Sequence, residues 1–120
     1  MAHQHSGLTF EQFTASLGDS APPAGLDNAL QALWHEAAAN GPGATGPQTE
    51  DGDMPANWNT AHGLVQRQRD SVGRWVHGYL HRLEGDEDNA AGWYERAGQP
   101  FPTETLAEEW AHIVTELLAR

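Results

Sequence analysis

The chain of 120 residues contains no cysteine and no lysine. Without cysteine it can form no disulfide, no thiolate metal site and no thiol nucleophile. No apolar run approaches the roughly 18 residues that a membrane span needs. The N-terminal residues lack the basic and apolar regions of a secretory signal. We therefore expect a cytoplasmic protein, with residues 1–8 forming a flexible lead-in.

Positive charge is also scarce in this sequence. Six arginines stand against 17 acidic residues, and the formal net charge is −11. An electric field of this sign repels phosphate groups. The composition therefore predicts neither nucleic acid nor an anionic membrane as a partner, and it favours cationic partners, including metal ions.

Strand patterns are missing, because no segment alternates apolar and polar residues with a period of two. Apolar residues recur instead at helical spacing, and residues typical of helix starts and stops flank each such segment. The predicted helices span about 9–17, 26–40, 57–68, 71–84, 87–97 and 104–119. We therefore predict a single all-α domain over residues 9–120, with about six helices in an antiparallel array.

The segment 40–56 interrupts this helical pattern. Glycine, proline and acidic residues dominate it, so it offers little that could pack into a core. We predict a mobile loop that can be deleted without loss of the helical fold. In the last helix, by contrast, the spacing is regular and predicts an outward face made by Glu104, Glu108, Glu109 and Glu116.

Five tryptophans, at positions 34, 58, 75, 93 and 110, each lie on the apolar face of a different predicted helix. A buried indole removes on the order of 200 Å² from water. We therefore interpret the tryptophans chiefly as core residues, with the alternative that one or two of them line a pocket.

Residues 72–105 carry a pattern of small and aromatic residues across two predicted helices. The pattern consists of Gly78, Gly85-Asp86, Ala90, Tyr94, Ala97 and Pro102. It resembles one tetratricopeptide or Sel1-like helical repeat. The resemblance implies two helices in close approach, with residues 104–119 as a C-terminal capping helix. The whole second half, from Trp58 onward, also looks like a family of small uncharacterised bacterial and fungal proteins, which implies no catalytic residues.

The repeat resemblance implies a first hypothesis for function. At matching positions of the repeat, Trp75, Tyr79 and Arg82 would face a concave peptide-binding groove, where Arg82 would hold a carboxylate. A salt bridge from Arg82 to a nearby acidic residue is the alternative. The hypothesis is a non-enzymatic interaction module that binds a protein or peptide, or that self-associates, with no cofactor.

The histidines provide a second hypothesis. His77 and His81 are four residues apart and share one helical face, and Glu84 follows on the same face. His62, on the preceding helix, would complete a three-histidine and carboxylate set suited to zinc or another divalent metal. Two alternatives use the same histidines, a buried polar network and acid–base chemistry near neutral pH. The sequence has no cysteine or suitably placed serine to act as a nucleophile in an enzyme.

Overall fold

The computed structural model describes residues 8–44 and 54–119, and every regular element in these ranges is helical. The elements in chain order are α1 (Phe10–Ala15), the 3₁₀-helix η1 (Ser16–Gly18), α2 (Asn28–Asn40), α3 (Ala56–Val65), α4 (Ser71–Leu83), α5 (Glu87–Ala97) and α6 (Leu106–Leu118). The all-α prediction is confirmed. None of these helices is long and apolar enough to cross a membrane.

The helix starts follow from side chains that satisfy free backbone N–H groups. The Thr9 hydroxyl oxygen accepts a hydrogen bond from the backbone N–H of Gln12, and the Gln12 side-chain oxygen accepts one from the backbone N–H of Thr9, as the capping-box pattern predicts. Asp70 and Asp86 cap α4 and α5. The helix ends were predicted less accurately. For example, α3 ends at Val65, whereas the sequence predicted an end near residue 68.

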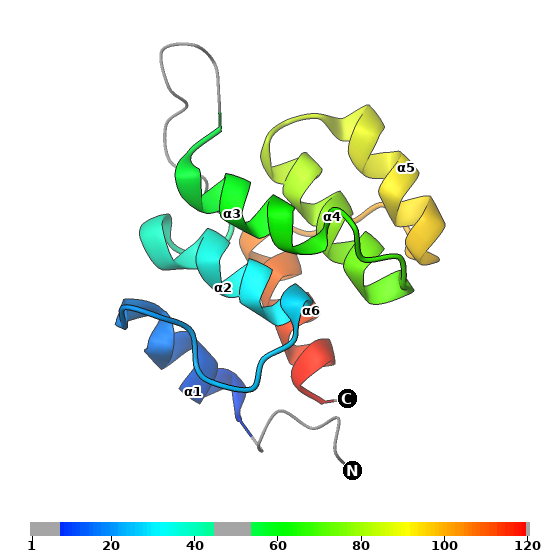
Figure 1. The fold of residues 1–120 in the computed structure, drawn as a ribbon. Coiled ribbons are helices and arrows are strands. Elements are labelled where there is room, and N and C mark those ends of the chain that lie inside the picture. Colours follow the sequence, from blue (N-terminus) through cyan, green and yellow to red (C-terminus); the bar gives the residue numbers. More distant parts are fainter. Residues whose placement is uncertain (1–7, 45–53, 120) are drawn as a thin grey trace.

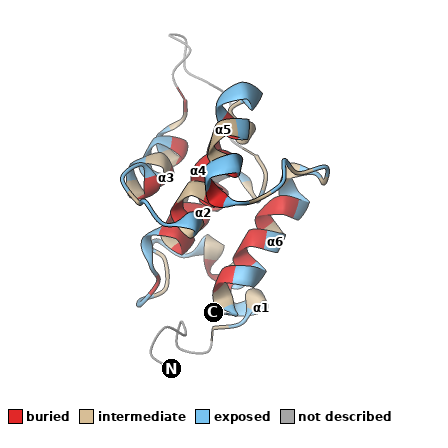
Figure 2. Cartoon of the chain, turned by 90° about the vertical axis from the view of Figure 1, so that its right-hand side faces the viewer, coloured by how far each residue is buried: buried red, intermediate tan, exposed pale blue. Residues whose placement is uncertain are grey.

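Helix α4 lies at the centre of the arrangement and contacts α2, α3, α5 and α6 (Figure 1). Its buried residues run around most of its circumference, and the buried sides of α2 and α6 also face inward (Figure 2). Four of the five tryptophans belong to the core, as predicted, whereas Trp93 is only half-buried. The half-buried position leaves part of the Trp93 indole at the surface.

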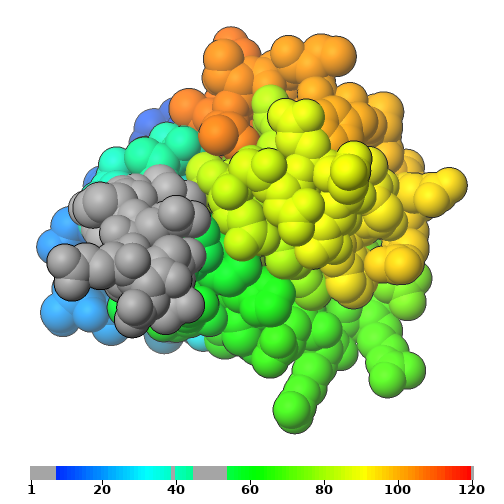
Figure 3. Space-filling view, turned by 90° about the horizontal axis from the view of Figure 1, so that it is seen from above, coloured from blue at the N-terminus to red at the C-terminus, as the bar shows by residue number. Residues whose placement is uncertain are grey.

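Helices α4 and α5 approach each other closely at Gly78. A Cβ atom at this position would lie 3.3 Å from both the Cβ of Trp93 and the ring of Tyr94. Figure 3 shows α5 on the surface between the residues leading to α6 and the green residues of α3 and its following connection. The close packing of α4 against α5 therefore depends on the absence of a side chain at Gly78.

The prediction for Glu109 is wrong. It faces inward and is 1% exposed, not part of the outward acidic face. The Arg82 guanidinium donates to Glu109 Oε1 at 2.7 Å, and the Tyr94 hydroxyl donates to Oε2 at 2.6 Å. Because both carboxylate oxygens have partners, the charge can be buried between α4, α5 and α6.

Most of the predicted mobile loop, residues 45–53, lies outside the described residues, as does the lead-in over 1–7. The described start of the loop packs against α6. Gly43 has a φ of +78°, and a Cβ there would come within 2.5 Å of the Ala107 nitrogen. Only glycine fits this combination of positive φ and close backbone contact.

Candidate metal centre

The fold brings three of the predicted ligands together. His62 lies on α3, and His77 and His81 lie on successive turns of α4. One ring nitrogen from each histidine lies within 4.8 Å of the others. The α4 histidines are 5% and 8% exposed, while His62 is half-buried. We call these three residues the histidine cluster.

His62 and His77 make direct contact across the two helices. Their Nε2 atoms are 3.0 Å apart, which is hydrogen-bond distance. A hydrogen bond here requires that one of the two nitrogens carries a proton while the other has a free lone pair. The Nδ1 of His77 is buried and has no hydrogen-bond partner among the described residues. The two rings therefore direct their Nε2 atoms at each other, one as donor and the other as acceptor.

Two tryptophans flank the histidine cluster. Trp58 stacks on His62 with ring centroids 4.9 Å apart, and Trp93 stacks on His77 at 3.9 Å. The Trp58 indole is itself fixed, because its N–H donates to the Leu80 carbonyl at 2.8 Å. The His62 and His77 rings are thus packed against aromatic faces, and their Nε2 atoms contact each other.

Glu84 lies next to the cluster in a different role from the one predicted for a direct ligand. Its Oε1 is 2.5 Å from Nδ1 of His81. A carboxylate at Nδ1 orients the imidazole and leaves Nε2 as the nitrogen available to a metal ion. Glu84 also belongs to a second, more exposed group with His81 and Asp86, whose possible ligand atoms lie within 4.8 Å of one another.

The surroundings favour neutral imidazoles. The pKa of His77 is lowered to about 4, chiefly by burial and in smaller part by the nearby His62, His81 and Arg96. Burial is also the main cause that lowers the pKa of His62, with a smaller contribution from His81. Neutral rings at pH 7 have the lone pairs that metal ligation requires.

The residues predicted to form a peptide-binding surface lie mostly in the interior. Trp75 and Tyr79 are buried, and the Tyr79 hydroxyl donates to Oε1 of the buried Glu36 at 3.0 Å. Arg82 donates to Glu109 and to the backbone carbonyl of Glu104. In the structure these three side chains therefore connect α4 to α2 and α6.

The stacking of Trp58 and Trp93 on the histidines was not predicted from the sequence. A signal was present for the first pair, because Trp58 and His62 are four residues apart and share a helix face. No comparable signal marks Trp93, which reaches His77 from the neighbouring helix.

Comparison of the chain with protein-family models, with curated proteins and with solved structures finds no match. The resemblance to a tetratricopeptide or Sel1-like repeat stays a prediction from the sequence. The function must therefore be inferred from the geometry of the site itself.

Proposed function

We propose that this protein binds a divalent transition-metal ion such as zinc through His62, His77 and His81. The observation that carries the proposal is the convergence of three buried or half-buried ring nitrogens from two helices, within 4.8 Å of one another. Imidazole nitrogens are preferred ligands of zinc, copper, nickel and iron. Three protein ligands leave a coordination position for water or another molecule.

The distances fit this role with small adjustments. Two nitrogens that each lie about 2.1 Å from a tetrahedral zinc ion are roughly 3.4 Å apart. The His62 and His77 Nε2 atoms are 3.0 Å apart, so their separation needs to change by only a few tenths of an ångström. The most distant ligand atoms, at up to 4.8 Å, need to approach by about 1.5 Å. A metal ion would replace the histidine–histidine hydrogen bond.

Glu84 supports the proposal as an orienting residue. Metal-bound histidines generally donate their second ring N–H to a carboxylate, a carbonyl or water. The His81–Glu84 contact supplies this arrangement before any metal is bound. Trp58 and Trp93 also restrict the other two rings, His62 and His77, but they do so by stacking and not by hydrogen bonding.

Zinc titration of chelator-treated, desalted protein tests the proposal. We expect one ion per chain by calorimetry and by elemental analysis. His62→Ala and His77→Ala should each abolish stoichiometric binding, while His112→Ala on the exposed side of α6 should bind as the natural protein does. His62 is half-buried, so its variant is expected to fold even if His77→Ala does not. Equal binding by all these variants, or none by the natural protein with any of zinc, nickel and cobalt, would refute the metal centre.

Peptide binding through Trp75, Tyr79 and Arg82, or self-association, remains a second proposal from the sequence. Peptide binding through these side chains would require α4 to separate from α2 and α6, because they are buried or paired there. Metal binding requires only side-chain adjustment. We therefore favour the metal centre.

A further inference from the structure

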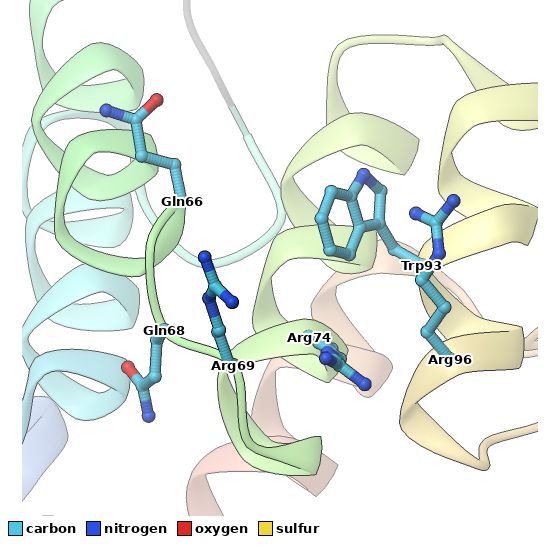
Figure 4. A pocket seen from close by; sticks show the side chains of 6 residues that line it. All are labelled: Gln66, Gln68, Arg69, Arg74, Trp93 and Arg96. Atoms are coloured by element: carbon cyan, nitrogen blue, oxygen red, sulfur yellow. The ribbon is translucent and has the colours of Figure 1, made fainter.

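A small hollow lies beside α5, on the side of the molecule where the α3–α4 connection meets α4. Its volume is about 280 Å³, and its lining comes from separate segments of the chain. The lining residues are Gln66, Gln68, Arg69, Arg74, Trp93 and Arg96. Figure 4 shows Gln66, Gln68 and Arg69 from the end of α3 and the connection, Arg74 from α4, and Trp93 and Arg96 from α5. We call this hollow the arginine pocket.

The charge of the pocket is opposite to that of the whole chain. Half of the six arginines line it, although the formal net charge is −11. Within residues 8–44 and 54–119, no carboxylate forms an ion pair with Arg69, Arg74 or Arg96. Acidic residues are abundant in the sequence, yet none in these ranges lies within ion-pair distance of the three guanidinium groups.

Three like charges around one hollow repel one another, and an anion placed between them removes this repulsion. Guanidinium groups also match carboxylate and phosphate oxygens in pairs, which makes arginine the common residue for recognising oxyanions. The Arg96 guanidinium already lies over the Trp93 ring, 4.8 Å from its centroid, which restricts its position. The pocket thus has one partly ordered donor, Arg96, and space for a ligand.

We infer that the arginine pocket is a binding site for a small molecule that carries a phosphate or several carboxylates. The pocket volume of about 280 Å³ lies just below the range of about 300–1,000 Å³ that is typical of pockets for drug-sized ligands. The ligand is therefore small. The negative field of the whole chain opposes long-range attraction of anions. Binding therefore depends on the three arginines at short range and weakens with added salt.

Calorimetric titration of metal-free protein at low ionic strength tests this inference, with inorganic phosphate and citrate as separate probes. Removing the metal beforehand makes the result independent of the proposed metal centre. We expect saturable one-to-one binding of at least one probe. Tighter phosphate binding would assign a phosphate ligand, and tighter citrate binding would assign a polycarboxylate.

Matched charge variants separate the pocket from the general charge of the surface. Arg74→Gln and Arg96→Gln should each weaken binding by roughly tenfold. Arg67→Gln removes the same charge from an exposed residue outside the pocket lining and should change affinity less than about twofold. Because Arg67 and Arg96 are both exposed, these two variants are expected to fold. An equal loss in Arg67→Gln, or no saturable binding of either probe up to about 10 mM, would overturn the inference.

The indole N–H signal of Trp93 gives a second readout by nuclear magnetic resonance. It can be assigned by its disappearance in Trp93→Phe. On addition of the probe that binds, we expect this signal to shift while that of Trp34, which donates to Ser16, stays in place. A shift at Trp34 without one at Trp93 would place the anion elsewhere and contradict the inference.

Discussion

The Trp93 indole lies nearly flat on the His77 imidazole, with ring centroids 3.9 Å apart and an angle of 14° between the planes. Trp93 also lines the arginine pocket. One side chain is thus shared between the proposed metal centre and the proposed anion site. Its fluorescence should respond to events at the histidine cluster.

Open-shell metal ions quench nearby indoles, so Cu²⁺ or Co²⁺ should reduce the tryptophan fluorescence of the natural protein. The stacked indoles of Trp58 and Trp93 are expected to account for most of the loss. Quenching should therefore become smaller in Trp58→Phe and in Trp93→Phe, and should stay unchanged in Trp34→Phe. Identical quenching in all three variants would argue against binding at the cluster.

Removing the carboxylate next to His81 should weaken metal binding without preventing it. In Glu84→Gln the His81 ring loses a charged acceptor at Nδ1, and loss of such a partner of a metal-binding histidine typically costs about 10–100-fold in affinity. Competition with a coloured zinc chelator measures the change. Glu87→Gln, in the exposed first turn of α5, is the control and should leave affinity within about twofold. If Glu84→Gln binds as tightly as this control, then Glu84 does not orient His81.

Two glycines on facing helices should respond oppositely to alanine. Gly92→Ala meets nothing within 4 Å and should stabilise the protein by about 0.5–1 kcal/mol, because alanine is the better helix former. Gly78→Ala places a methyl 3.3 Å from Trp93 and Tyr94 and should destabilise it by about 1–3 kcal/mol. Denaturant unfolding measures both. A stabilised Gly78→Ala would mean that α5 can move away from α4 at little cost.

The buried Glu36 should make the free energy of unfolding depend on pH between about 4.5 and 8. Burial raises its pKa from 4.5 to about 8, so the folded protein keeps this proton after the unfolded chain has lost it. Between these two values the folded state binds more protons, and stability falls as the pH rises. Glu36→Gln keeps an acceptor for Tyr79 and removes the titration. We expect the variant to gain stability relative to the natural protein between pH 5 and 9, by up to a few kcal/mol.

Urea unfolding at several pH values tests this expectation. Glu95→Gln, on the exposed side of α5, serves as the control and should follow the natural protein at every pH. His77 acts at the other end of the range. Its pKa is lowered from 6.5 to about 4, so its contribution is present above 6.5 and is lost as the pH falls toward 4. The comparison of Glu36→Gln with the natural protein separates the two groups.

Loss of the Arg82 charge should be among the most damaging changes on α4. Arg82→Met leaves Glu109 buried without its cationic partner, and breaking a buried pair in this way costs about 3–5 kcal/mol. Thermal or denaturant unfolding measures the loss. Arg67→Met, at an exposed position in the connection after α3, should change stability by less than about 0.5 kcal/mol. Similar small effects for both variants would show that Glu109 is readily neutralised by a proton.

The sequence was most informative where the determining residues are neighbours in the chain. The Thr9–Gln12 capping box and the α4 stripe rest on contacts within one or two turns, and both were predicted. Glu109 was misplaced because its partners, Arg82 and Tyr94, lie on other helices. A helical spacing pattern assigns a carboxylate to the outer face unless such distant partners are known.

The candidate sites show the same division. The spacing of His77 and His81 was sufficient to place them on one face, and packing of α3 on α4 then supplied His62. The arginine pocket was not predicted, because residues 66–69, Arg74 and Arg96 meet only through the tertiary fold. Their separation along the chain gives no periodic signal.

The two ends of the described chain meet at Trp110. Phe10 and Phe13 lie against its ring with centroids 6.1 and 5.8 Å away, and its indole N–H donates to the Leu33 carbonyl of α2. In an open repeat array each unit touches only its sequence neighbours, so units can be added or removed one at a time. Here the first and last described helices pack against each other, so neither is a separate end unit. The domain should unfold in a single cooperative transition, and truncation of α6 should release α1 at the opposite end of the chain.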